Sequence, residues 1–237
     1  MPRIPLWTGI RDQIEQDIRR GRYREREQLP TEASLSVRFG VNRHTVRRAL
    51  ADLSDRGMVQ SRRGAGVFVT PAQTEYPIGE RVRFHRNLLA SGRTPKKKFL
   101  LLETRTADQV EREALSPARG DKVHVCEGLS YADETPIALF RSVFPAVAVP
   151  GILDTLRTVS SITKALALNG VADYTRASTR VTAKAASPTL AAHLNIPQGT
   201  PVLRTTSLNV DPEGQPIEFG QTWFAGDRVT LTIEPDR

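Results

Sequence analysis

The segment FGVNRHTVRRALADLSDRG runs from Phe39 to Gly57. Asn42 is a suitable N-cap for a helix, because its side-chain oxygen can accept from a free backbone N–H, and Gly57 can end the helix. Three apolar residues recur at helical spacing after this cap: Val46, Leu50 and Leu53. The segment therefore predicts a helix that buries one face and leaves its basic residues exposed.

Two further helices are expected upstream. Ile10, Ile14 and Ile18 recur every four residues, which predicts a helix over residues 8–20 with Thr8 as its N-cap. A short helix should follow from Thr31 and end at Gly40. Because only residues 40–42 separate it from the next helix, the pair predicts a helix-turn-helix.

A hairpin is expected directly after the third helix. Residues 58–61 and 67–70 have the composition of short strands, and residues 62–66 read RRGAG. Glycine tolerates the positive φ of a tight hairpin tip, which places the arginines at its entrance. This hairpin would be the wing of a winged helix.

The positive charge of the chain is concentrated in this region. The net charge is +8, and the first 70 residues hold 14 Arg against eight acidic residues. A solvated cationic helix face is the alternative reading, but the capped helix, glycine turn and glycine-tipped hairpin coincide here and favour DNA binding. The candidate DNA-binding residues are Arg43, His44, Thr45, Arg47, Arg48, Arg62, Arg63, Gly64 and Gly66.

Residues 6–69 resemble the winged-helix domain of the GntR family of bacterial regulators. The resemblance rests on LPTE at residues 29–32, FGVNR at 39–43, TVRRAL at 45–50 and RGAGVFV at 63–69. It implies that Arg43 and Arg47 read bases and that the glycine-containing wing tip lies along the minor groove. Ala33 departs from the Arg that many members have at this position, which removes one expected DNA contact.

The remaining sequence predicts an α+β fold with an antiparallel sheet. The winged helix-turn-helix domain is expected to span residues 1–70. Residues 71–80 are polar and proline-bounded and are expected to be a linker, with a second domain at residues 81–237. Long runs of strands with interspersed helices favour an antiparallel arrangement. Strands are expected at residues 99–106, 122–132, 137–144, 177–185, 201–210 and 217–225, and helices at 81–90, 108–115, 160–169 and 189–194.

This second region resembles the UTRA-type effector domain of the HutC subfamily, which is related in fold to chorismate lyase. The motifs include DETPI at residues 133–137, RSVFP at 141–145 and GTPVLR at 199–204. Within the subfamily the chain is most similar to regulators of phosphonate metabolism. The resemblance implies a repressor that is released by a small anionic effector, a phosphonate or phosphate ester. Because one short winged helix offers a modest interface and two-fold operators mirror two-fold proteins, we expect the repressor to bind an inverted-repeat operator in double-stranded DNA as a homodimer, with its dimer contacts in residues 81–237.

Four residues are candidates for contacting this effector: Ser130, Arg141, Arg176 and Arg180. Arg176 and Arg180 share a face if residues 174–184 are extended. Sugar-phosphate-sensing relatives carry an Arg-x-Arg pair where this chain has Gly128 and Ser130. Each of these arginines taken alone is more often a surface residue, and the same holds for the Lys run at residues 96–98.

Catalytic and metal chemistry find little support in the sequence. His85, His124 and His193 lack metal-ligand spacing, and Cys126 lies in an apolar strand pattern typical of a buried thiol. We expect no cofactor, no metal and no membrane partner. One cysteine and no signal-like start favour a cytoplasmic protein. The alternative from another class is a chorismate-lyase-type enzyme with a DNA-binding anchor.

Overall fold

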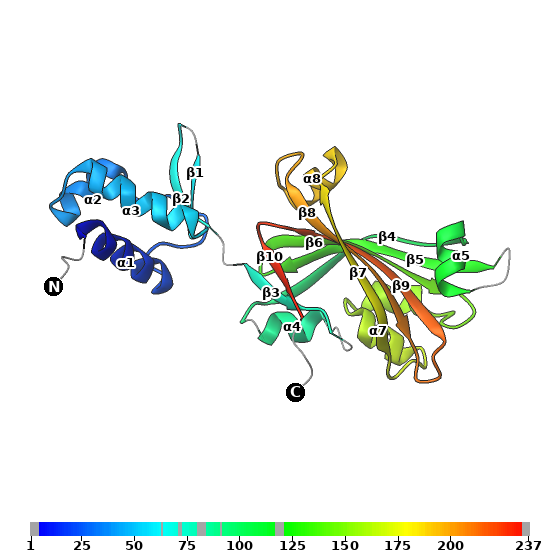
Figure 1. Cartoon of the computed structure of the whole chain (residues 1–237). Helices are drawn as coiled ribbons and strands as arrows, with labels where there is room; N and C mark the ends of the chain where they lie inside the picture. The colour runs from blue at the N-terminus through cyan, green and yellow to red at the C-terminus, as the bar shows by residue number, and fades with distance from the viewer. Residues whose placement is uncertain are drawn as a thin grey trace. The chain divides into compact units, whose positions relative to one another are not determined.

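The computed structural model describes residues 5–62, 64–70, 73–79, 84–90, 92–116 and 121–233 (Figure 1). The chain divides into two compact units, Met1–Ala72 and Gln73–Arg237. Each unit has hydrophobic clusters of its own. The two units are therefore described separately.

The first unit is a winged helix-turn-helix. Its elements are α1 (Leu6–Arg19), α2 (Glu32–Phe39), α3 (Arg43–Asp55), β1 (Val59–Arg62) and β2 (Gly66–Val69), and the two strands pair antiparallel. The apolar stripes expected from the sequence meet in one core, which is formed by Ile10, Ile14, Leu29, Leu35, Val46, Ala49, Leu50, Leu53, Val59 and Val69.

The turn between α2 and α3 forms as its sequence predicts. Gly40 ends α2 with a φ of 65°, a left-handed conformation that glycine adopts without strain. The Asn42 Oδ1 atom accepts from the backbone N–H of Thr45 at 2.9 Å, which caps α3. The expected cap of α1 was wrong: Pro5 is the N-cap residue, and the Thr8 hydroxyl donates to the Pro5 carbonyl instead of accepting from an amide.

The second unit is built on a six-stranded antiparallel sheet with the order β4-β5-β6-β9-β8-β7. Its strands are β4 (Pro95–Thr106), β5 (Lys122–Ala132), β6 (Thr135–Pro145), β7 (Thr175–Ala185), β8 (Pro201–Val210) and β9 (Pro216–Ala225). Together with the helices, this sheet confirms the predicted α+β class.

A second, two-stranded sheet corrects the predicted linker. Within residues 71–80, Thr74–Pro77 forms β3, which pairs in parallel with β10 (Val229–Thr232). Thr74 and Tyr76 are buried while their neighbours Glu75 and Pro77 are exposed. This alternation is the strand pattern that the flanking prolines concealed, and it places the start of the second unit before residue 81.

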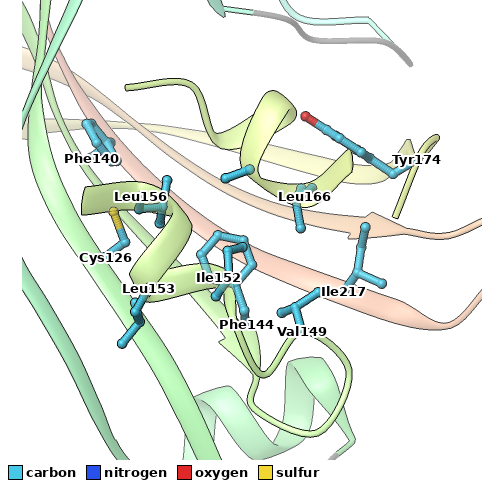
Figure 2. Close-up of a cluster of buried hydrophobic side chains, with 11 residues drawn as sticks. Cys126, Phe140, Phe144, Val149, Ile152, Leu153, Leu156, Leu166, Tyr174 and Ile217 are labelled. Atoms are coloured by element: carbon cyan, nitrogen blue, oxygen red, sulfur yellow. The ribbon is translucent and has the colours of Figure 1, made fainter. Parts of the chain in front are cut away.

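Within the described residues of this unit, five helices lie against the two faces of the large sheet. They are α4 (Phe84–Ala90), α5 (Gln109–Leu115), α6 (Ile152–Thr158), α7 (Ile162–Leu168) and α8 (Pro188–Leu194). Figure 2 shows α6 and α7 residues packed with Cys126, Phe140 and Phe144 of the central strands. Leu139 of β6 points the other way and packs with α8, while Val143 packs with α5.

Candidate functional site

The N-terminal half of α3 presents its basic residues to solvent. Arg43, His44, Arg47 and Arg48 are exposed, while Val46 is fully buried in the core. Thr45 is half-buried, and both its amide and its hydroxyl donate to Asn42 Oδ1 at 2.9 Å. Its hydroxyl therefore belongs to the helix cap, and only its acceptor lone pairs remain for a ligand.

Arg47 is held in place by an acidic residue of α2. The Arg47 Nε and Nη2 atoms donate to the two carboxylate oxygens of Glu32, at 3.0 and 2.7 Å. This hydrogen bonding from Arg47 lowers the pKa of Glu32 below its ordinary value. A bidentate pair fixes the plane of the guanidinium group and leaves its outer N–H groups available.

Arg48 lies on another side of α3 and packs against α1. Its guanidinium carbon is 4.8 Å from the centre of the Trp7 ring, within the range of a cation–π contact. Because Arg48 is nevertheless exposed, it can still face a phosphate. The structure thus separates Arg47 and Arg48, which are adjacent in sequence, into two different environments.

The wing is fixed to the body of the first unit through Gln28. The Gln28 Nε2 atom donates to the Ala65 carbonyl at 2.7 Å. Gly64 and Gly66 have φ angles of 74° and 107°, as expected at a tight hairpin tip. Arg62 is exposed and stacks on Phe68, with 4.5 Å between the guanidinium carbon and the ring centre. Arg63 lies outside the described residues.

The second unit holds a cavity of about 400 Å³ on one face of the large sheet. Its floor comes from alternate residues of the central strands, including Phe140 and Ser142 of β6 and Glu218 of β9. Residues of β3, α4 and α7 complete the walls. A volume of this size fits a small metabolite.

Lys97 of β4 contributes a cation to the cavity. Its Nζ atom lies 3.6 Å from the Phe140 ring centre and 4.5 Å from the Phe84 ring centre. It also donates to the Ser130 hydroxyl at 3.2 Å. Lys97 is half-buried, and the desolvation of its ammonium group lowers its pKa to about 8. The sequence analysis treated this residue as part of a solvated turn, because the alternation that points only Lys97 inward depends on the sheet.

Arg176 of β7 is the second strand cation at the cavity. Its Nε atom donates to Asn209 Oδ1 at 2.6 Å, and its Nη1 atom donates to the Thr179 hydroxyl at 3.2 Å. The amide of Asn209 in turn donates to Glu218 Oε2 at 2.7 Å. Arg176 is therefore oriented by a chain of hydrogen bonds that continues along the cavity floor.

The other sequence candidates lie elsewhere. Ser130 is buried behind Lys97 and does not itself line the cavity. Arg141 lies between Phe140 and Ser142 on β6, so its side chain points to the opposite face of the sheet. There its Nε atom pairs with Glu127 at 3.0 Å. The structure does not bring Arg141 into the cavity.

The expectation that Arg176 and Arg180 share a face was wrong. Arg176 is paired with Asn209, whereas Arg180 is paired with Thr206. The register shifts between Arg176 and Ser178, which adds one residue to β7 and inverts the orientation of all that follow. Arg180 is accordingly exposed on the face away from the cavity.

Cys126 has the environment that its strand pattern predicted. It is fully buried in the cluster beneath α6, and burial raises the pKa of its thiol to about 12. A thiol of this kind is a poor nucleophile. His124 is also buried, and its Nδ1 atom lies 2.8 Å from the Thr104 hydroxyl, while its Nε2 atom is buried without a hydrogen-bond partner among the described residues.

A winged helix with exposed arginines and a separate unit with a ligand-sized cavity define a ligand-responsive DNA-binding regulator. Comparison with known families supports this class. Residues 6–69 match the model described as bacterial regulatory proteins, gntR family, and residues 90–230 match the UTRA domain. The chain belongs to the GntR family of bacterial regulators, with the HutC-type combination of these two domains.

Relatives align over nearly the whole chain. A helix-turn-helix transcriptional regulator of Rhizobium meliloti (strain 1021) is 34% identical over 98% of this chain and 95% of its own length. The probable transcriptional regulator PhnF of Escherichia coli (strain K12) is 32% identical over 96% and 94%. The crystal structure of PhnF from Mycobacterium smegmatis has a TM-score of 0.69 at 24% identity, covering 96% of this chain and 99% of that one.

These relationships decide between the two classes that the sequence left open. GntR regulators bind operator DNA and small-molecule effectors, and the relatives described above are named as regulators. The protein is therefore a transcriptional regulator and not an enzyme of the chorismate-lyase type. No helix in the described part of the chain is both long and apolar enough to span a bilayer.

Proposed function

We propose that the protein is a repressor that binds an inverted-repeat operator as a homodimer. Arg43 and Arg47 would reach base edges in the major groove from the exposed end of α3, with His44 and Thr45 beside them. Arg48, Arg62 and Arg63 would contact phosphates, and the glycines Gly64 and Gly66 would let the wing tip approach the minor groove. The observation that supports this assignment is the exposure of these α3 side chains beside a capped turn.

We propose further that a small phosphonate or phosphate ester occupies the cavity and releases the operator. The placement of Lys97 and Arg176 at the cavity carries this part of the proposal. Ammonium and guanidinium groups are strong partners of phosphate-like oxygens. Ser130 would act indirectly by holding Lys97. The similarity to PhnF regulators supports the phosphonate class. On this proposal, the repressor would control genes for phosphonate uptake or degradation.

A DNA-binding titration tests both parts. Fluorescence anisotropy is measured with DNA from upstream of the gene and its neighbours, first alone and then with phosphonates or phosphate esters. We expect specific binding to an inverted repeat and weaker binding when an effector is present. Equal affinity for the repeat and for random DNA would contradict the operator assignment, and affinity unaffected by every anion tested would contradict the effector class.

A further inference from the structure

Glu218 is an acidic side chain on the floor of a cavity that we assign to an anion. It belongs to β9, is only 8% exposed, and lines the same cavity as Lys97 and Arg176. A carboxylate in this place would repel a ligand that carried negative charge alone. Its presence therefore adds information about the rest of the ligand.

The protein satisfies Glu218 with neutral donors. The Ser142 hydroxyl donates to Glu218 Oε1 at 2.6 Å, and the Asn209 amide donates to Oε2 at 2.7 Å. Arg176 donates to Asn209 and not to the carboxylate. No ion pair within 4.0 Å involves Glu218 among the residues that the structure describes. Lys97 acts on Glu218 only at longer range, through a coulombic interaction. A buried carboxylate without a hydrogen-bonded cationic partner is costly, and a ligand cation would offset that cost.

The carboxylate has capacity for a further donor. Its two oxygens offer about four lone-pair positions, and the two hydrogen bonds above use half of them. Gly220, two residues along β9, also lines the cavity. A Cβ at this position would lie 2.7 Å from the Ser207 Oγ atom, so glycine keeps the neighbouring floor free of a side chain.

The two cationic side chains of the cavity, Lys97 and Arg176, come from different strands than Glu218 and contact other groups. Lys97 lies between two aromatic rings and bonds to Ser130, while Arg176 comes from β7 at the other edge of the sheet. The cavity thus has cationic groups from both edge strands and an anionic group from a central strand. This distribution suits a ligand that has both signs of charge.

We propose that the effector is a zwitterion whose ammonium group binds Glu218 and whose phosphonate or phosphate group binds Lys97 and Arg176. The inference rests on the proposed function and specifies its ligand class as aminoalkyl phosphonates or phosphates. An ammonium group has three donors and a positive charge, so it can donate a hydrogen bond to Glu218 and also place a positive charge beside the carboxylate. A ligand hydroxyl would supply only the former.

Calorimetric titration of the full chain at pH 7 with three matched probes tests the proposal. These are 2-aminoethylphosphonate, 2-hydroxyethylphosphonate and ethylphosphonate, which share the acid group and differ at the far end. We expect 2-aminoethylphosphonate to bind about tenfold or more tightly than the other two, in line with a charge-assisted hydrogen bond. Equal affinity for the amino and hydroxy probes would overturn the proposal.

Two variants locate the effect. Glu218→Gln should reduce the affinity for 2-aminoethylphosphonate about tenfold and leave that for ethylphosphonate unchanged or stronger. Glu127→Gln is the matched control, because Glu127 pairs with Arg141 on the opposite face, and it should change neither affinity. A preference for the amino probe that survives Glu218→Gln would overturn the assignment of Glu218. If this variant does not fold, the wild-type probe series still decides.

The outcomes also separate this inference from the proposed function. If the wild type binds ethylphosphonate tightly and the amino group adds no affinity, the proposal of an anionic effector would stand and the proposal of a zwitterionic effector would be contradicted. Failure of all three probes to bind would overturn both the phosphonate class and the inference drawn from it.

Discussion

Arg47 combines two properties that a base-reading residue needs. It is exposed, and its guanidinium plane is fixed by two hydrogen bonds to Glu32. The outer N–H groups can then meet a guanine edge with little further loss of side-chain freedom. The pair is exposed to solvent, so its value lies in orientation more than in stability.

Arg47→Ala is expected to weaken operator binding by about 1–3 kcal/mol and to relax the preference at one base pair of each half-site. Glu32→Gln should raise the affinity for random DNA, because it removes a negative charge near the phosphates, and should lower discrimination. Anisotropy with operator and random duplexes measures both. Arg48→Ala is the control and should weaken binding to the operator and to random DNA by the same factor. If Arg47→Ala leaves the ratio of operator affinity to random-DNA affinity unchanged, Arg47 does not read a base.

Lys97 gives the proposed effector site a predictable pH dependence. Burial lowers its pKa from 10.5 to about 8, so the cation is present below this pH and is lost as the pH rises through it. Effector affinity should therefore fall between pH 7 and 9.5, as measured by calorimetry. Lys97→Met should bind more weakly and lose this part of the pH dependence. A wild-type profile identical in shape to that of Lys97→Met would contradict the assignment.

At the scale of single elements, local patterns predicted those parts that are determined by local chemistry. The bounds of β5 and β8 agree with the sequence expectation, and Asn42 caps α3 as predicted. The sequence analysis missed α6, β3 and β10, which are short and are stabilised mainly by tertiary packing. Strand pairing between residues far apart cannot be read from one short segment.

The candidate site was harder to predict than the fold, because its geometry depends on register. A single extra residue in β7 turned Arg180 away from the cavity while Arg176 remained in it. Lys97 was hidden within a run of three lysines, of which sheet alternation selects one. Glu218 gave no signal, since its role depends on Ser142, which is 76 residues away in sequence.

The wing should be sensitive to a methyl group at one glycine. Gly66 has a φ of 107°, and an added Cβ would lie 2.5 Å from Gln28 Nε2, the atom that donates to Ala65. Gly66→Ala should cost roughly 1–3 kcal/mol through backbone strain and loosen the wing. Thermal unfolding and anisotropy should show lower stability and weaker binding to all duplexes. Gly64→Asn is the control for stability alone, because asparagine tolerates a positive φ and the position has open space, so its unfolding temperature should stay close to that of the wild type.

At the scale of the whole molecule, the boundary between the units is more tightly defined than the sequence indicated. A cut after Ala72 leaves the first core complete, whereas a cut after Pro77 would remove β3 from the second unit. We expect the fragment 1–72 to fold, as seen by circular dichroism, and to bind the operator poorly, because the proposed dimer contacts lie in the second unit. Tight, cooperative operator binding by the fragment would contradict that placement.

The cavity and the proposed DNA-reading helix belong to different units, so the proposed control of DNA binding requires an energetic coupling between them. An effector can shift this equilibrium only by its difference in affinity for the two states, and couplings of about 1–3 kcal/mol are typical. Saturating effector should therefore reduce operator affinity roughly 5- to 150-fold. Because linkage is reciprocal, saturating operator DNA must weaken effector binding by the same factor, which calorimetry with and without DNA measures.

Arg176→Ala should weaken effector binding and shift induction to higher effector concentrations, since Arg176 lines the cavity. Arg180→Ala, from the opposite face of the same strand, should leave both unchanged. Unequal factors in the two titrations would show that one of them reports a further equilibrium, such as binding of the effector to the DNA itself, and would contradict control by linkage within the protein.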